Sequence, residues 1–236
     1  MRSAVQSHRL TPSAFEGQQT LDWEVTVTGG VAGGSFRNGA GDRVQAWTVA
    51  GPLQKITVSV RGTVETQDCA GLLGGHRESV PPEVYLRDTP AMAVDAALEA
   101  LARGVAGHDR LDKAHAQVVA GAIAYRPGAT HAHTTAAEAL ALAEGLCQDH
   151  AHALIACARV HGIPARYVSG HLLAAQDGTP HEAAHAWAEL HVPGLGWVRF
   201  DPANRCCPDP RYIRLGLGGG APEGLDVRVA VLSGAQ

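Results

Sequence analysis

The chain has 236 residues, 45% of them hydrophobic and 5% aromatic, which suits one large or two modest domains with an aliphatic core. A net charge of −4 and a pI of about 6.3 give no basic surface for nucleic acid or anionic membranes. No apolar run spans a membrane, no secretory signal opens the chain, and the five cysteines have no framework spacing. We therefore expect a cytoplasmic protein with reduced thiols and with neither nucleic acid nor membrane as partner.

Residues 1–85 are predicted to form an antiparallel, sandwich-like β domain. Apolar and polar residues alternate in three stretches, over residues 21–28, 43–49 and 53–65. The pairs Asn38-Gly39 and Gly51-Pro52 predict turns beside these stretches. The segment 67–83 is rich in Gly and Pro and is interpreted as the linker to a second domain.

Residues 86–236 are predicted to form an α+β domain, with helices preceding an antiparallel sheet. Helices are expected over 91–103 behind a Thr89 cap, over 111–125, from the Thr135-Ala-Ala-Glu138 capping box, and from Cys147 to about His161. Strands are expected over 165–173, 184–192, 197–201 and 225–232. The last of these strands could return to the N-terminal sheet.

A thiol, an imidazole and a carboxylate follow one another at positions that the fold can bring together. Cys147 opens a helix, where the helix dipole and unbonded N–H groups favour a thiolate. His185 and Asp201 lie on the two arms of a predicted hairpin. They share one face of the sheet if the arms pair residues with an even sum, such as Glu189 with Arg199, or if a bulge intervenes. We predict this arrangement, with the cysteine helix packed across that face.

The residues around these three positions resemble the transglutaminase-like superfamily of thiol enzymes. The motifs are Gly-Leu-Cys-Gln-Asp-His-Ala-His-Ala from Gly145, His-Ala-Trp-Ala-Glu from His185, and Trp-Val-Arg-Phe-Asp-Pro-Ala-Asn from Trp197. The Ser-His-Arg-Leu-Thr-Pro-Ser stretch near the N-terminus resembles the β-rich domain that precedes this core in bacterial transglutaminase-like proteins. The resemblance implies a papain-like core with Cys147 as nucleophile, His185 as general base and acid, and Asp201 as orienter, without cofactor or metal.

The implied reaction is acyl transfer on an amide bond of a protein or peptide, through an acyl-enzyme. The family includes peptidases, amidases and cross-linkers, so the resemblance leaves the acyl acceptor open. Hydrolysis is favoured, since the sequence shows no dry site for an amine. Gln148 is a candidate oxyanion donor, and Trp187 either walls the cleft, shields the His–Asp bond, or is a plain core residue.

Two other functions remain open at this stage. The same core could be a non-catalytic peptide-binding or assembly module, although binding alone does not require all three triad residues. The chain has thirteen histidines, with His-Ala-His at 131–133 and 150–152, which makes a metal-dependent hydrolase an alternative function. It has no His-Glu-x-x-His motif, however. Cys206-Cys207 is interpreted as a loop, with a vicinal disulfide or metal site as alternatives.

Overall fold

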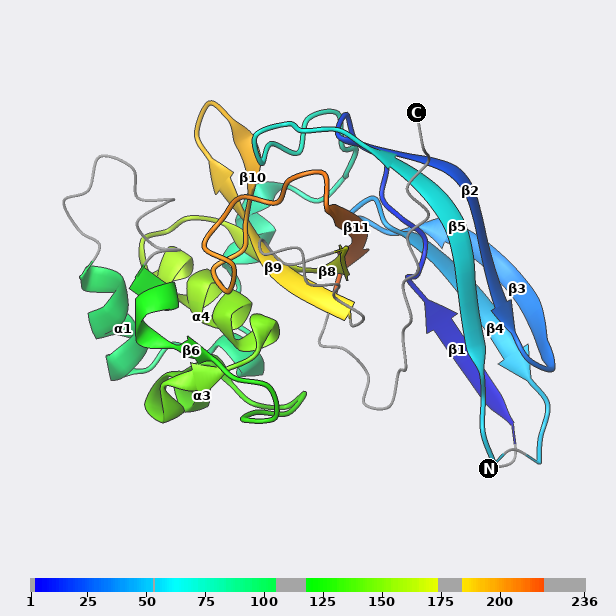
Figure 1. Ribbon diagram of the computed structural model, residues 1–236, viewed down its shortest axis with the longest axis horizontal. Coiled ribbons are helices and arrows are strands. Elements are labelled where there is room, and N and C mark those ends of the chain that lie inside the picture. The colour runs from blue at the N-terminus through cyan, green and yellow to red at the C-terminus, as the bar shows by residue number, and fades with distance from the viewer. Residues whose placement is uncertain (1–2, 53, 105–117, 174–183, 219–236) are drawn as a thin grey trace.

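Residues 3–52, 54–104, 118–173 and 184–218 are described in the computed structural model. They form an N-terminal region of long strands and a core in which helices pack on an antiparallel sheet (Figure 1). In the view of Figure 1 the core sheet lies between the helices and the N-terminal strands.

The N-terminal strands form two antiparallel sheets. One has the order β1 (Ala4–His8), β4 (Arg43–Val49), β3 (Gly30–Arg37), and the other pairs β2 (Gln18–Val27) with β5 (Val58–Thr66). The alternating stretches over 21–28 and 43–49 are confirmed as strands, and the third stretch is a strand only from Val58 onward. Neither β1 nor β3 was predicted. In β3 the glycines break the alternation of apolar and polar side chains that indicates a strand.

The segment predicted as a linker lies along the edge of the core sheet. Leu72 pairs with Val198, the Leu73 N–H donates to the Trp197 carbonyl at 3.0 Å, and the Arg199 N–H donates to Gly71 at 2.9 Å. A 3₁₀ turn, η1 (Pro82–Leu86), follows. The segment therefore extends the sheet on which the predicted site depends.

The first predicted helix is interrupted near its start. Thr89 and Pro90 open only the 3₁₀ turn η2 (Pro90–Met92), and α1 (Ala96–Arg103) begins four residues after Met92. The Asp95 side chain accepts a hydrogen bond from the Leu98 N–H at 2.8 Å and caps α1. Asp95 thus replaces Thr89 as the cap of this helix.

The second predicted helix falls partly outside the described residues. Residues 118–122 are helical, but the structure differs from the prediction at the end, where Ala124–Tyr125 form strand β6. β6 pairs in parallel with β7 (Glu144–Gly145), immediately before the cysteine helix. Tyr125 is therefore held beside the start of that helix.

The third and fourth helices are confirmed. The Thr135–Glu138 capping box opens α3 (Ala136–Leu142). The cysteine helix α4 (Cys147–Val160) begins at the thiol and is followed by Gly162 in the left-handed conformation, with φ of +68°.

The core sheet has the strand order β10-β9-β8-β11. Its members are β8 (Ala165–Leu172), β9 (Ala184–Val192), β10 (Gly196–Phe200) and β11 (Tyr212–Leu217), all antiparallel to their neighbours. The first three were predicted, whereas β11 was not. The predicted strand over 225–232 lies outside the described residues.

The two faces of the core sheet have different partners. Ala186, Ala188 and Leu190 of β9 belong to the main hydrophobic cluster together with most of α4. Trp187 points the other way and packs with Val168, Leu172 and Tyr212. The helices therefore cover one face, and the N-terminal region lies against strand β11.

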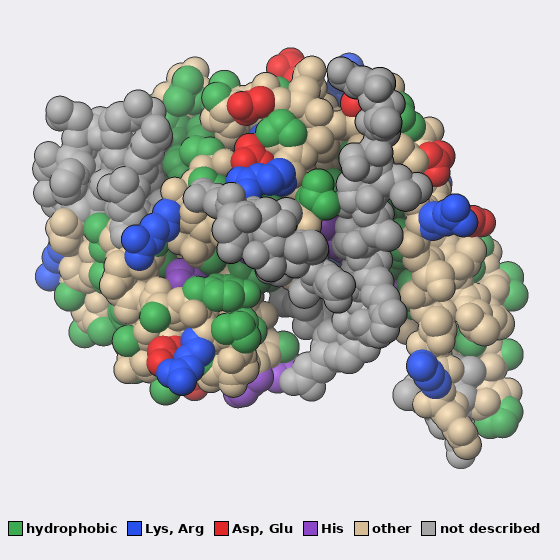
Figure 2. Space-filling model, viewed as in Figure 1, with side chains coloured by type: hydrophobic (Ala, Val, Ile, Leu, Met, Phe, Trp, Pro, Cys, Tyr) green, Lys and Arg blue, Asp and Glu red, His purple; other side chains and the backbone are tan. Residues whose placement is uncertain are grey.

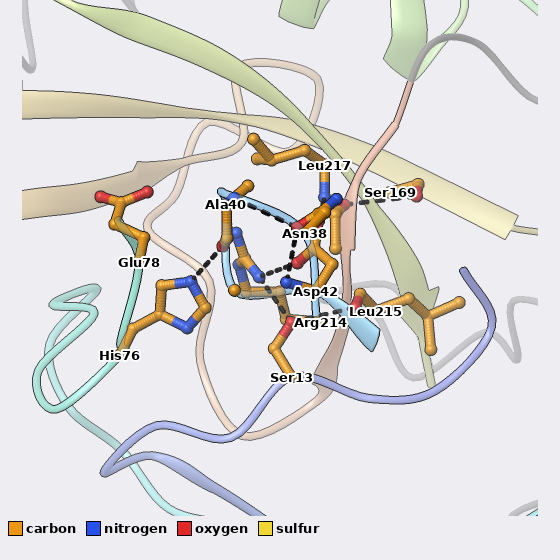
Figure 3. Close-up of polar contacts among 12 residues, drawn as sticks. Ser13, Asn38, Ala40, Asp42, His76, Glu78, Ser169, Arg214, Leu215 and Leu217 are labelled. Carbon is orange, nitrogen blue, oxygen red and sulfur yellow. Dashed lines mark hydrogen bonds and ion pairs between the residues drawn. The ribbon is translucent and has the colours of Figure 1, made fainter. Parts of the chain in front are cut away.

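A buried chain of alternating charges joins the N-terminal region to the core. Asp42 accepts from Arg214, Arg214 and Arg166 both donate to Glu189, and Arg166 also pairs with Glu78. Figure 3 shows the N-terminal end of this chain, with Arg214 pointing toward Asp42. Because all these side chains are largely or fully withdrawn from solvent, each charge depends on its neighbours for compensation.

The surface of the described residues is mixed in charge on the face shown in Figure 2, where acidic and basic side chains are interspersed. Among the described residues no helix has the length and apolarity needed to cross a membrane.

Candidate active site

Cys147 is the first residue of α4 and is half-buried. The approach to the helix is tight, because a Cβ at Gly145 would lie 2.8 Å from the Cβ of Asp149. The Asp149 carboxylate accepts the Leu146 N–H at 2.7 Å and also the Thr130 hydroxyl. Asp149 therefore has a structural role, since it bonds an amide at the start of the helix.

His185 and Asp201 are hydrogen-bonded. The strands β9 and β10 pair Glu189 with Arg199, which is the even-sum register predicted from the sequence. His185 Nε2 lies 2.6 Å from Asp201 Oδ2, and both side chains are almost completely buried. The ring is therefore fixed by the carboxylate, which leaves its other nitrogen for a second partner.

The Cys147 thiol is near enough to this ring to help raise the pKa of His185. The prediction that α4 packs across the His185 face is nevertheless wrong for the body of the helix. Trp187, two residues after His185, lies on the face opposite α4, whereas Ala186 and Ala188 contact the helix cluster. Cys147 still meets His185 because each stands at the beginning of its element, where the helix passes the end of the sheet.

The electrostatics of the pair favour a protonated imidazole. Burial alone would lower the pKa of His185, but hydrogen bonds to Asp201 and Cys147, and the charges of both groups, raise this pKa to about 10. Burial would also raise the pKa of Asp201, and the bonds from His185, Asn204 and Tyr212 lower it instead. An imidazolium held by a carboxylate beside a thiol can stabilise a thiolate and protonate a leaving group.

Two residues around Asp201 were missed as functional candidates. Asn204 donates its side-chain amide to Asp201 Oδ2 at 2.7 Å and its backbone N–H to Oδ1 at 3.1 Å. The Tyr212 hydroxyl donates to the same Oδ2 at 2.8 Å. Asn204 closes the Asp-Pro-Ala-Asn stretch and could have been proposed from it. Tyr212 lies on the unpredicted strand β11 and had no such signal.

Gln148 and Trp187 are both buried beside the triad. The Gln148 side chain donates to the His131 carbonyl at 2.8 Å, so its amide is already engaged. Trp187 has no exposed surface and packs edge-on against Tyr212, with ring centroids 5.6 Å apart. Of the readings offered for Trp187, its position fits a core residue beneath the His–Asp bond.

The histidines of α4 have structural contacts. Each ring nitrogen of His150 lies 2.8 Å from a carbonyl oxygen, one from Leu146 and one from Ile123. His152 packs on Tyr167, and burial lowers its pKa to about 4. Within the described ranges, no three His, Cys, Asp or Glu side chains gather in a way that could hold a metal ion.

Two family models match the chain. Residues 99–202 match the transglutaminase-like superfamily, and residues 1–65 match the bacterial transglutaminase-like N-terminal region. The chain therefore combines a transglutaminase-like core with a bacterial transglutaminase-like N-terminal region. The match to the core model includes Cys147, His185 and Asp201.

Curated relatives of this transglutaminase-like chain include proteins named only as uncharacterized. One from Mycobacterium tuberculosis (strain H37Rv) is 41% identical over 40% of this chain and 33% of that protein. One from Mycobacterium leprae is 28% identical over 89% of this chain and 80% of that protein. The chain thus matches about a third of the length of the first of these relatives.

Among solved structures, the chain resembles a protein from Cytophaga hutchinsonii whose assignment as a cysteine protease is itself provisional. The TM-score is 0.73 at 21% identity, over 96% of this chain and 80% of that one. At this identity the similarity concerns the fold. It confirms the prediction of a papain-like core preceded by antiparallel N-terminal strands.

Proposed function

We propose that this transglutaminase-like protein is a thiol enzyme that transfers acyl groups from amide bonds of proteins or peptides. Cys147 is the nucleophile, His185 the general acid and base, and Asp201 the residue that orients the imidazole. The observation that carries the proposal is the buried His185–Asp201 bond of 2.6 Å, with the Cys147 thiol near enough to help raise the pKa of the imidazole. A purely structural His–Asp pair would not need a half-exposed thiol at a helix start.

The proposed reaction begins with the Cys147 thiolate beside the His185 imidazolium. The sulfur attacks the amide carbonyl carbon, and the carbonyl π electrons move to oxygen. When the tetrahedral intermediate collapses, the carbon–nitrogen bond breaks and the departing nitrogen takes the proton from His185. A thioester and a neutral imidazole remain, and the imidazole then takes a proton from the second substrate as that group attacks the thioester.

The negative oxygen of the intermediate requires donors in the first turn of α4. The Cys147 backbone N–H is the proposed main donor, because the first N–H groups of a helix have no partner within the helix. The Gln148 side chain would have to leave the His131 carbonyl to contribute. We therefore assign the oxyanion site to the helix N-terminus and give Gln148 a role in holding the 126–135 segment.

Water is the proposed second substrate, which makes the product a carboxylic acid. Transfer to an amine needs a site that excludes water and binds the amine, and we identify no such feature among the described residues around Cys147. All five cysteines are free thiols, which is compatible with the proposed reducing, cytoplasmic location.

The proposal is tested by site-resolved alkylation with iodoacetamide between pH 6 and 8, followed by mass spectrometry. We expect Cys147 to react at least about tenfold faster than Cys69 or Cys206 at pH 7. The Cys147→Ala variant should lose turnover of peptide amides and glutamine amides, whereas Cys69→Ala should keep it. Equal reactivity of the three thiols at neutral pH would refute the activated nucleophile.

The same preparation separates the other two functions. A peptide-binding module would leave Cys147→Ala with full biological activity. A metal-dependent hydrolase would lose turnover on treatment with a chelator, while the thiol enzyme would lose it on alkylation.

A further inference from the structure

Tyr212 reaches the candidate acid from the far side of the core sheet. It is the first residue of β11, which is separated from β10 by β8 and β9 in the sheet order. Its ring is buried at 2% exposure and packs against Trp187 and His185 at centroid distances of 5.6 and 5.8 Å. The side chain therefore crosses beneath the pair to place its hydroxyl 2.8 Å from Asp201 Oδ2.

The Asp201 carboxylate is held through its two oxygens from different elements. Oδ2 accepts from His185 at 2.6 Å, from Asn204 at 2.7 Å and from Tyr212 at 2.8 Å. Oδ1 accepts the Asn204 N–H at 3.1 Å. Asn204 belongs to the same short loop as Asp201, so Tyr212 is the donor that ties the acid to a distant strand.

A second thiol contacts the Tyr212 hydroxyl. Cys206 Sγ lies 3.4 Å from that oxygen. Because the carboxylate can only accept, Tyr212 donates its proton to Asp201 and its oxygen is left to accept from the Cys206 S–H. Two backbone bonds fix the geometry, from Asp201 N–H to the Cys206 carbonyl at 2.8 Å and from Cys206 N–H to the Asp201 carbonyl at 3.1 Å.

We propose that Tyr212 is a positioning residue for Asp201 and that the Cys206 thiol orients the Tyr212 hydroxyl. The inference rests on the proposed function, since it concerns how the orienting acid of that triad is held. Without the tyrosine donor the Asp201 carboxylate can rotate about its side-chain bonds, which weakens the hydrogen bond between its Oδ2 and His185. The imidazolium is then less stabilised, and the thiolate beside it is less available.

The test follows alkylation of Cys147 by iodoacetamide as a function of pH, a readout that needs no knowledge of the natural substrate. In the wild-type protein the rate of Cys147 alkylation should show a step at alkaline pH, where His185 loses its proton. In Tyr212→Phe this alkaline step should move to lower pH by about one unit. The Tyr85→Phe variant is the matched control. It also removes a tyrosine hydroxyl that donates to a carboxylate, but the acceptor is Glu78, which is not part of the triad.

Cys206 supplies a second, gentler probe if Tyr212→Phe does not fold. Cys206→Ala should shift the alkaline step in the same direction by a smaller amount, and Cys206→Ser, which keeps a donor, should restore the wild-type profile. An unchanged profile in folded Tyr212→Phe, or equal profiles for the Ala and Ser variants, would overturn the inference. A wild-type Cys147 no more reactive than Cys69 would instead overturn the proposed function, so the two failures are distinguishable.

Discussion

Replacing Glu189 by Gln removes one charge from the centre of the buried chain while keeping the side-chain size. The Glu189 carboxylate is fully buried and accepts from Arg166 Nε at 2.8 Å and from Arg214 at 2.8 and 3.1 Å. The amide of the variant would turn N–H donors toward one of these guanidinium groups. Two buried cations would lose their common anion.

The magnitude follows from the pKa of the carboxyl group. Burial would raise the pKa of Glu189, but Arg214 and Arg166 lower it from 4.5 to about 2. At about 1.4 kcal/mol per pH unit this corresponds to about 3 kcal/mol in favour of the folded state. Breaking a buried ion pair by removing one partner costs about 3–5 kcal/mol in other proteins. We therefore expect Glu189→Gln to lower the free energy of unfolding by about 3–5 kcal/mol.

The sign of the pH dependence gives an independent check. Because the folded-state pKa is depressed, the contribution of Glu189 is complete above pH 4.5 and is lost as the pH falls toward 2. Urea unfolding of wild type and variant should therefore give free energies that converge as the pH falls below 4.5. Glu99→Gln, which removes an exposed pair with Arg103, should cost under about 0.5 kcal/mol. A Glu189→Gln loss under about 1 kcal/mol, constant with pH, would refute the reasoning.

Three further predictions concern the site and its supports. Asp201→Asn removes the carboxylate that raises the pKa of His185, so turnover should fall at least about 100-fold and the alkaline step of thiol alkylation should move from about pH 10 toward 6.5. Gly170→Ala would place a Cβ 2.1 Å from a backbone oxygen of β11 and should cost about 1–3 kcal/mol in urea unfolding, whereas Gly34→Ala, with no atom within 4 Å, should change stability by under about 0.5 kcal/mol. Thr135→Ala removes the cap of α3 and should lower the thermal midpoint by an amount equivalent to about 0.5–2 kcal/mol.

The pairing of His185 with Asp201 could be predicted because strand geometry has a period of two. Once a hairpin over 184–201 is assumed, the parity of the residue numbers decides whether the two side chains share a face. The structure has the even register, with Glu189 opposite Arg199. The sequence therefore limited the pairing of His185 and Asp201 to two possible registers of the hairpin, and the structure has the one that was predicted.

The partners of Glu189 could not be predicted in the same way. Parity places Arg199 opposite Glu189, but the carboxylate bonds instead to Arg166 and Arg214 on two other strands. Arg199 donates to the Gly71 carbonyl at 3.2 Å. One true partner belongs to β11, whose register shifts between Arg214 and Gly216, so its side chains do not keep the regular alternation that predicts a strand.

The face covered by α4 also required the structure. Parity separates the side chains of β9 into two sets but does not say which set meets the helix. Small side chains at Ala186 and Ala188 allow the helix to approach closely on one face, while Trp187 fills the other. Side-chain volume, rather than the position of the catalytic residues, decided the packing. The nucleophile then reaches His185 past the end of the sheet.

The N-terminal region contacts β11, the strand whose first residue, Tyr212, is bonded to the candidate acid Asp201. The Ser13 N–H donates to the Arg214 carbonyl at 2.9 Å, and the Leu217 N–H donates to Asp42 Oδ2 at 2.8 Å (Figure 3). These contacts satisfy polar groups of β11 that the core sheet alone leaves exposed. Because the same strand begins with Tyr212, whose hydroxyl reaches Asp201, any slippage of β11 would be transmitted to the carboxylate. The N-terminal region therefore contacts the strand that carries Tyr212 through Ser13 and Asp42, two residues that lie between its own strands.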